Sequence, residues 1–264
     1  MGTGTSVNVR HPSRLSSKRG TGIVRPMGAG NRLPLLSDGM VHLWQVPLCL
    51  PDTLLAALEK SLQDEERADC RHLHDADKTR RVVSRGALRV LLSRYLDVHP
   101  RELSFGYGTY GKPFLASPRT SICLDFNVSQ WADIVVIAAA LSRSLGIDVE
   151  RVRPVPELDS ILSLHFQEGV GFLGSTEGDE RILRFLRIWT RIEASAKAFG
   201  RPLTDNLLSR EALSYEEGGG IRLEHSGEWH LQDLQLPPRH VGALCARGFP
   251  CRIVMHDFSE FLLL

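Results

Sequence analysis

Two acidic residues near the middle of the chain have the spacing of side chains that share one face of a β-strand. In the segment Gly146–Glu150, which reads GIDVE, alternate residues point to the same side, so Asp148 and Glu150 lie next to each other. Neighbouring carboxylates repel, and Mg²⁺ relieves that repulsion because hard cations prefer oxygen ligands. A solvated strand end, with the arginines that follow as ionic partners, explains the same residues without a metal. The pentapeptide alone leaves both interpretations open.

A second candidate group lies in the segment Trp189–Ala198, which reads WTRIEASAKA. Glu193 and Lys197 are four residues apart and share one face of a helix, with Trp189 one turn earlier. Beside the two strand carboxylates, Glu193 would add a third acid for a metal and Lys197 an ammonium group for a phosphate. The alternative is an ordinary surface ion pair, worth about 0.2–0.5 kcal/mol.

Two turn-forming segments supply further candidates for anion binding. In Tyr110–Pro113 (YGKP), glycine permits a tight turn and proline stiffens it, so Lys112 would point in one fixed direction. Such a lysine suits a phosphate, or it is simply exposed in a turn. In Phe126–Gln130 (FNVSQ), Ser129 and Gln130 close a strand and can donate hydrogen bonds to an anion or cap the turn.

The hydrophobic periodicity predicts the elements that must position these residues. The predicted helices cover residues 52–67, about 75–96, 156–166 and 179–199. Asp52 and Asp179 are expected to cap the first and last helix, and Gly200 to end the last one in the left-handed conformation. The predicted strands cover residues 41–46, 103–105, 122–126, 134–140, 145–149, 221–223, 229–234, 241–245 and 252–255.

The order of elements, a strand followed by helices and then strands, occurs twice along the chain. This order predicts an α+β protein built from two similar halves, residues 41–142 and 143–264. Residues 1–40 are rich in Gly, Ser, Arg and Pro and lack apolar periodicity, so we expect them to be a disordered, basic leader.

Composition excludes several classes of function. The formal net charge is +1, but residues 1–40 hold six of the 32 basic residues and a single acid, so the rest of the chain is mildly acidic. That balance argues against nucleic acid as the main partner. The longest apolar run, Ile134–Leu141, is too short to span a bilayer. Five scattered cysteines without metal-ligand spacing indicate reduced thiols in a cytoplasmic protein.

Taken in order, the four motifs resemble the signature of the 4'-phosphopantetheinyl transferases. The resemblance is strongest to the large monomeric type that activates peptide and polyketide synthetases. It covers about residues 41–256 and includes the arginine-rich helix that contains Arg80 and Arg85. The motifs are GKP at Lys112, FNVSQ at Phe126–Gln130, GIDVE at Gly146–Glu150 and WTRIEASAK at Trp189–Lys197.

The resemblance implies two pseudo-symmetric halves with coenzyme A in the cleft between them. Asp148, Glu150 and Glu193 would hold Mg²⁺ on the pyrophosphate. Glu193 would also take the proton from a serine of an acyl or peptidyl carrier protein, with Lys197 as the second catalytic residue. The serine would attack the phosphorus that bears the phosphopantetheine arm, and 3',5'-ADP would leave. The implied coenzyme A ligands are Arg80, Arg85, Lys112, Ser129, Gln130 and Lys197.

Some positions depart from the family pattern. Gln130 stands where the family has His, and Ile192 where it has Lys, so two positive charges are missing. Glu65 and Ala68 lie where relatives often have basic residues for the nucleotide. These changes imply weaker coenzyme A binding. They also leave open a non-catalytic relative that binds coenzyme A or a carrier protein without transfer, although the intact acids favour the enzyme. Short motifs do not identify the carrier protein.

Overall fold

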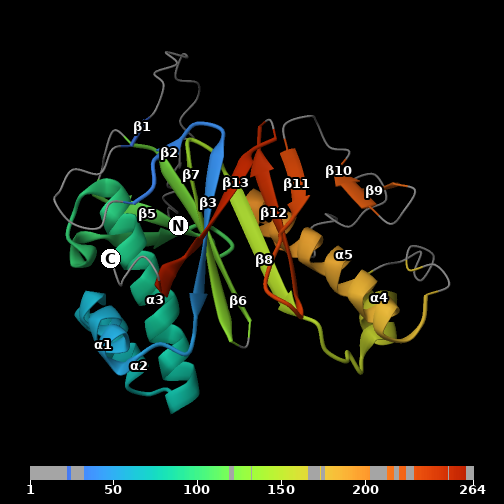
Figure 1. Cartoon of the computed structure of the whole chain (residues 1–264), viewed down its shortest axis with the longest axis horizontal. Helices are drawn as coiled ribbons and strands as arrows, with labels where there is room; N and C mark the ends of the chain where they lie inside the picture. Colours follow the sequence, from blue (N-terminus) through green and yellow to red (C-terminus); the bar gives the residue numbers. More distant parts are fainter. Residues whose placement is uncertain are drawn as a thin grey trace, which may run out of the picture.

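A computed structural model of the chain describes residues 23–24, 33–118, 122–131, 133–165, 173, 176–202, 213–216, 220–223, 229–248 and 250–259 (Figure 1). The helices are α1 (Asp52–Ser61), α2 (Asp64–Cys70), α3 (Asp75–Leu96), α4 (Leu158–His165) and α5 (Gly178–Phe199), with a 3-10 turn at Pro100–Glu102. The strands are β1 (Ile23–Val24), β2 (Leu36–Ser37), β3 (Met40–Pro47), β4 (Ser104–Tyr107), β5 (Pro113–Ser117), β6 (Leu124–Trp131), β7 (Ile134–Leu141), β8 (Leu145–Arg151), β9 (Leu213–Glu216), β10 (Gly220–Leu223), β11 (Trp229–Asp233), β12 (His240–Arg247) and β13 (Arg252–Asp257).

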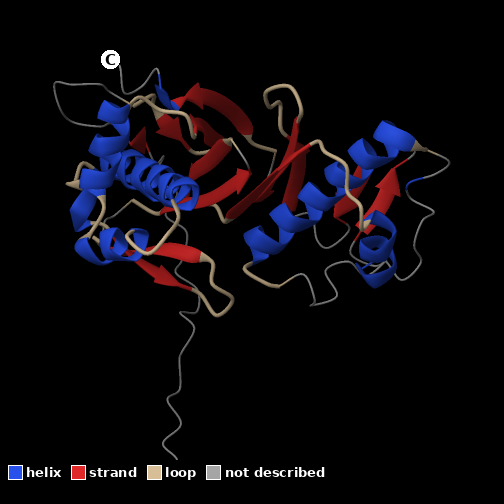
Figure 2. Ribbon diagram, turned by 90° about the horizontal axis from the view of Figure 1, so that it is seen from below, coloured by secondary structure: helices blue, strands red, loops and turns tan. Residues whose placement is uncertain are grey.

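Two sheets form the centre of the molecule. The larger has the strand order β13-β3-β7-β6 and the smaller the order β11-β12-β8, and three two-stranded sheets lie outside them. Helices α1–α3 lie on the side of the larger sheet and α5 lies beside the smaller one (Figure 1). The view from below shows the same separation (Figure 2). This mixture of sheets and separate helices confirms the predicted α+β class.

Strand β7 holds the two sheets together because both of its faces are buried. Val135 and Ile137 belong to the apolar cluster that packs on α3, whereas Val136 and Ala138 belong to the cluster that packs on β8. A strand that is buried on both faces reads as a continuous apolar run, as the sequence predicted for this segment.

Among the described residues, no helix is long and apolar enough to cross a membrane.

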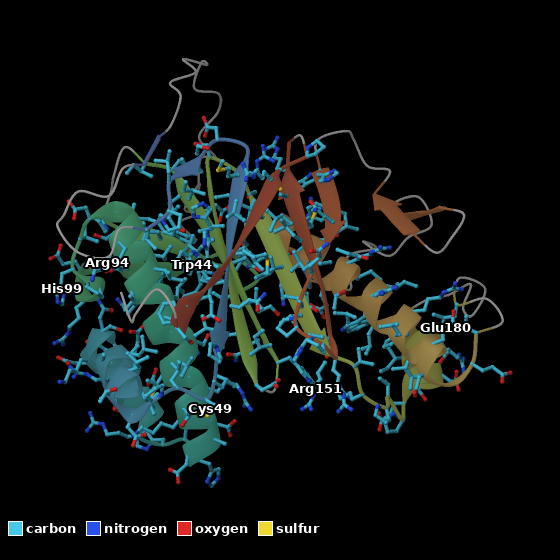
Figure 3. The ribbon with its side chains drawn as sticks, in the orientation of Figure 1. Trp44, Cys49, Arg94, His99, Arg151 and Glu180 are labelled. Carbon is cyan, nitrogen blue, oxygen red and sulfur yellow. The ribbon has the colours of Figure 1, made fainter. Side chains whose placement is uncertain are left out.

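The last strand of the chain returns to the first part of the fold. By sequence β13 belongs to the predicted second half, but it pairs in parallel with β3 at the edge of the larger sheet. His256 of β13 stacks on Trp44 with 4.5 Å between ring centroids. Trp44 lies between the larger sheet and α3 (Figure 3). It donates a hydrogen bond of 2.9 Å from Nε1 to the hydroxyl of Tyr95 on α3. These contacts fix β13 to the larger sheet.

The segment predicted as one helix over residues 52–67 forms two helices, α1 and α2. The chain is extended at Leu62 and Gln63, and Gln63 caps α2 through a capping box with Glu66. Gln63 also donates hydrogen bonds to the carbonyls of Arg101 and Leu103. The helix breaks because Gln63 forms the N-cap of α2 and binds these distant carbonyls. Local periodicity in the sequence does not show such long-range contacts.

The predicted helix caps differ from the observed ones at two positions. Pro51 and Glu177 occupy the N-cap positions, while Asp52 and Asp179 lie in the first helical turn. A negative charge there interacts favourably with the helix dipole, which explains why acids stand at both places. Gly200 does end α5 in the left-handed conformation, with φ at 64°, as predicted.

The structured part of the chain begins before Met40. Leu33 and Leu36 are buried in the cluster that packs on α3, and β2 pairs with β1. The prediction of disorder therefore does not hold for residues 33–40. Apart from Ile23 and Val24, the remaining residues of the predicted leader lie outside the described ranges.

Helix α5 lies directly on β8 because residue 146 is glycine. A β-carbon at Gly146 would be 2.2 Å from the amide nitrogen of Ala198 and 2.3 Å from the carbonyl oxygen of Ala194. Ala194 and Ala198 are buried in a small cluster with Ala243 and Cys245 of β12. Small side chains on both elements thus allow the helix backbone to touch the strand.

We predict that Gly146→Ala pushes α5 away from β8 and lowers the free energy of unfolding by about 1–3 kcal/mol, the usual cost of overpacking. Urea unfolding measures the loss. Gly108→Ala is the control, because a β-carbon there would meet only the carbonyl of Lys112 at 3.6 Å. Equal stability losses in the two variants would contradict the close approach of α5 and β8.

Candidate active site

Side chains of β6 join the two central sheets at the place where their edge strands meet. β6 is the edge of the larger sheet and β8 the edge of the smaller one. Asn127 accepts a hydrogen bond of 2.9 Å from the amide of Ile147, and Ser129 accepts one of 3.1 Å from the amide of Val149. These side-chain oxygens accept hydrogen bonds from amides of β8 that would otherwise bind the backbone of a neighbouring strand.

Asp148 is a buried carboxylate at this junction. Its Oδ1 accepts a hydrogen bond of 3.0 Å from Ser129 Oγ and forms an ion pair of 2.6 Å with Lys197 Nζ. Its Oδ2 is buried without a hydrogen-bond partner. Burial raises the pKa of Asp148, and the positive charge of Lys197 and the Ser129 hydroxyl oppose that rise. The structure therefore brings together three of the residues that the sequence predicted for the site.

Glu150 and Glu193 add two more negative charges near Asp148. Burial raises the pKa of Glu150 to about 7, and the charges of Asp148 and Glu193 contribute to the rise. Burial also raises the pKa of Glu193, together with the charge of Asp148, whereas Lys197 lowers it. Glu150 Oε2 is buried and has no hydrogen-bond partner among the described residues. The positive charges of Arg153 and Lys197 oppose the rise in the pKa of Glu150 but do not cancel it.

The donor chemistry of this group suits a hard cation, but its geometry is not that of a closed metal site. Among the residues that the structure describes, no three His, Cys, Asp or Glu side chains form a group ready to bind a metal. Lys197 instead occupies one oxygen of Asp148. The buried, unpartnered oxygens of Asp148 and Glu150 are the atoms that a cation such as Mg²⁺ would bind.

Apolar residues of α5 pack in a cluster with residues of α4 and β12. Ile192 is buried in this cluster with Leu158 of α4 and Val241 of β12, and the half-buried Trp189 packs against it. The hydrophobic periodicity of residues 179–199 predicts such an apolar face, which a helix needs in order to pack. Ile192 brings no positive charge to the site, as the sequence implied, and the aromatic wall at Trp189 stays a prediction.

Besides Ser129 and Lys197, three more of the predicted coenzyme A ligands have partners within the protein. Arg85 forms an ion pair of 3.0 Å with Glu66, binds the hydroxyl of Tyr107, and lies over the ring of Phe105. Arg80 pairs with Asp77 at 2.8 Å on the surface. Lys112 donates hydrogen bonds to the backbone carbonyls of Leu145 and Ala198. Gln130 is exposed near the end of β6.

Sequence reasoning did not single out two buried polar residues, Asn127 of β6 beside the site and Arg89 of α3. Of the two, Asn127 could have been found from the sequence, because an amide inside an apolar strand is unusual and indicates a specific partner. Arg89 is buried, pairs with Glu66 at 2.6 Å, and donates hydrogen bonds of 2.8 Å to the carbonyls of Pro100 and Leu103. A helix arginine of this kind cannot be distinguished by sequence from a solvated one.

The fold and the site together define an α+β protein with a buried acid group at the junction of two sheets. A family model described as "4'-phosphopantetheinyl transferase, N-terminal" matches residues 50–142. The chain is 32% identical to the 4'-phosphopantetheinyl transferase HetI of Nostoc sp. over 219 residues, which is 82% of this chain and 91% of that protein. It is 26% identical to the 4'-phosphopantetheinyl transferase Sfp of Bacillus subtilis over 209 residues, 76% of this chain and 90% of Sfp.

The chain belongs to the 4'-phosphopantetheinyl transferase family. The protein is therefore an enzyme that transfers the 4'-phosphopantetheine arm of coenzyme A to a carrier protein. This confirms the family, the activity and the substrate that the four sequence motifs predicted.

We predict that Glu150→Gln removes a pH dependence of stability. The folded state raises the pKa of Glu150 from 4.5 to about 7, so it binds this proton more tightly than the unfolded chain. The contribution to the free energy of unfolding is therefore complete below the ordinary pKa and is lost as the pH rises through about 7. Urea unfolding of metal-free protein between about pH 5 and pH 8 measures the slope. The variant should lose less stability than the wild type over this range.

Glu65→Gln, on the exposed side of α2, is the control for this experiment. If Glu150→Gln and the wild type have the same slope, Glu150 is not the group that releases the proton.

Proposed function

We propose that Asp148, Glu150, Glu193 and Lys197 form the active site at which a serine of an acyl or peptidyl carrier protein receives the arm. In the reaction the serine oxygen bonds to the phosphorus that bears the phosphopantetheine arm. The bond from that phosphorus to 3',5'-ADP breaks, and 3',5'-ADP leaves. Phosphoryl transfer of this kind needs positioning and neutralisation of charge more than covalent help.

The observation that carries the proposal is the concentration of buried acid beside one ammonium group. Burial raises the pKa of Asp148, Glu150 and Glu193, and the negative charge of Asp148 raises the pKa of both glutamates further. These three carboxylates would hold Mg²⁺ in our proposal. When bound, the cation would neutralise negative charge on the pyrophosphate of coenzyme A.

Glu193 is the proposed base for the carrier serine. Its carboxylate is half-buried on α5, and its raised pKa makes it a better proton acceptor near neutral pH than an exposed glutamate. Lys197, one helical turn later, opposes the rise in the pKa of Asp148 through their ion pair of 2.6 Å. In our proposal the same ammonium group also offers its positive charge to a phosphate.

We further propose that coenzyme A binds where the edge strands β6 and β8 meet, between two pseudo-symmetric halves. In this proposal β13 completes the sheet of the first half, and the halves otherwise divide near residues 142–143. Arg80 and Gln130, both on the first half, remain available to coenzyme A, since Arg80 has only a surface ion pair and Gln130 is exposed. We expect a monomer, because the site lies within one chain. Free cysteines are consistent with a cytoplasmic enzyme.

Mass spectrometry of an apo carrier protein tests the proposed reaction. The carrier is incubated with this protein, coenzyme A and Mg²⁺, and a mass gain of one phosphopantetheine is expected. Chelation of the metal should abolish the gain. No gain on either a fatty-acid or a peptide-synthetase carrier would favour a relative that binds coenzyme A without transfer.

We predict that Asp148→Asn and Glu193→Gln each reduce transfer by about 100-fold or more, because each removes a carboxylate without changing the side-chain shape. The assay is the same mass gain, followed over time, and circular dichroism shows whether the variants stay folded. Asp159→Asn is the matched control, because Asp159 pairs with Arg181 on the exposed side of α4. Near wild-type turnover in either site variant would exclude that residue from the active site.

We also predict that Gln130→His lowers the KM for coenzyme A by up to about tenfold, since a protonated imidazole adds a charge-assisted contact to a phosphate. The gain should be larger at about pH 6 than at about pH 8, because the imidazole loses its charge between them. Gln130→Asn provides a neutral control. An unchanged or higher KM would mean that position 130 does not lie near a phosphate.

A further inference from the structure

Lys112 connects the hairpin of β4 and β5 to the two elements that contain the acid site. Its Nζ donates a hydrogen bond of 2.9 Å to the carbonyl oxygen of Leu145 and lies 3.4 Å from the carbonyl oxygen of Ala198. Leu145 is the first residue of β8, and Ala198 lies in the last turn of α5. One ammonium group therefore contacts two elements that are distant in the sequence from each other and from its own hairpin.

The hairpin holds Lys112 in one direction. Gly111 has a φ of 80°, a conformation that favours glycine, and its amide donates a hydrogen bond to the carbonyl of Gly108. The amide of Gly108 in turn donates to the carbonyl of Lys112 at 2.9 Å. Phe105 and Leu115 of the hairpin pack against the apolar cluster of α3. The base of the lysine side chain is therefore fixed on the first half of the molecule.

The ammonium group of Lys112 donates a hydrogen bond to a carbonyl in the last turn of α5. The last four carbonyls of a helix have no partner within it. Ala196 and Lys197 accept hydrogen bonds from the chain that follows, through the amides of Arg201 and Gly200. Ala198 receives the ammonium of Lys112 instead. A positive charge at this end of a helix is also favourable for the helix dipole.

The surroundings of the Lys112 ammonium group are typical of a contact between buried groups that stabilises the fold. Lys112 is half-buried, and burial lowers its pKa, while the negative charge of Asp125 on β6 opposes that effect. Asp125 is half-buried, and its pKa is raised by burial and lowered by Lys112. A β-carbon at Gly200 would be 3.8 Å from Lys112 Cδ, so the stem of the lysine lies against the end of α5.

The carbonyls that Lys112 binds adjoin the residues of the acid site in sequence. Ala198 follows Lys197, which pairs with Asp148, and Leu145 precedes Gly146, on which α5 rests. We propose that Lys112 is a positioning residue, which holds the end of α5 against the start of β8 and so keeps Glu193 and Lys197 opposite Asp148. This inference rests on the proposed function for its effect on turnover. It replaces the expectation that the lysine of the GKP motif binds a phosphate.

Three variants test the inference. Lys112→Met keeps the length of the side chain and loses its donors, and Lys112→Arg keeps the charge and the donors. Lys78→Met is the matched control, because Lys78 forms only an exposed ion pair of 3.6 Å with Glu59. The readouts are kcat and KM for coenzyme A, the Mg²⁺ concentration that gives half-maximal activity, and hydrogen–deuterium exchange of the metal-free protein.

For Lys112→Met we expect kcat to fall by about 10–100-fold, because displacement of catalytic groups by about 1 Å has such an effect. KM for coenzyme A should stay within about twofold of the wild type, and the Mg²⁺ requirement should rise. Hydrogen exchange should increase in the last turn of α5 and the first residues of β8. Lys112→Arg should restore at least part of kcat, and Lys78→Met should match the wild type.

A rise of about tenfold in KM with kcat unchanged would overturn the inference, because that pattern identifies a ligand of coenzyme A. Unchanged exchange at the end of α5 would overturn it as well. The exchange experiment needs neither metal nor turnover, so it decides the positioning role even if the wild-type protein transfers nothing. Inactive wild-type protein would reject the proposed function alone. If Lys112→Met does not fold, the same readouts on Lys112→Gln, which removes the charge and shortens the side chain, decide the question.

Discussion

The structure depends on the compensation of one buried carboxylate, that of Asp148. A buried charge is tolerated only when it is paired and hydrogen-bonded, and Asp148 obtains both from different elements. Lys197 comes from α5 and Ser129 from β6, at 2.6 Å and 3.0 Å from the same carboxylate oxygen. The charge can be buried on β8 only if the helix and both sheets meet at this point. The second oxygen is buried without a hydrogen-bond partner among the described residues.

Small residues make that meeting possible. Gly146 and the alanines of α5 allow backbone to touch backbone, and this brings Lys197 within reach of a strand that would otherwise lie a side-chain layer away. On the other side, Asn127 and Ser129 replace the backbone ladder between the two sheets with side-chain hydrogen bonds. An ordinary ladder of backbone hydrogen bonds would have joined β6 and β8 into one sheet, whereas these side-chain hydrogen bonds join the edges of two sheets.

Helix α3 and the hairpin of β4 and β5 make further contacts that order the elements around this junction. Arg85 and Arg89 of α3 share Glu66 of α2, and Arg89 is buried with two backbone carbonyls as further partners. Arg85 therefore has a partner within the protein, although the sequence motifs had suggested it for coenzyme A. The hairpin packs on the apolar cluster of α3, and its Lys112 binds carbonyls of β8 and α5.

The sequence by itself determined what depends on local repetition. Strand alternation placed Asp148 and Glu150 on one side of β8, and the helical repeat placed Glu193 and Lys197 on one face of α5. The order of the four motifs was sufficient to identify the family. Only the tertiary structure decided the partners of the long side chains. Lys112 binds two backbone carbonyls, and Gln63 lies at a break between two helices, where it binds a carbonyl that is distant in the sequence. Periodicity is a property of neighbouring residues, whereas a flexible charged side chain binds whatever the fold brings within its reach.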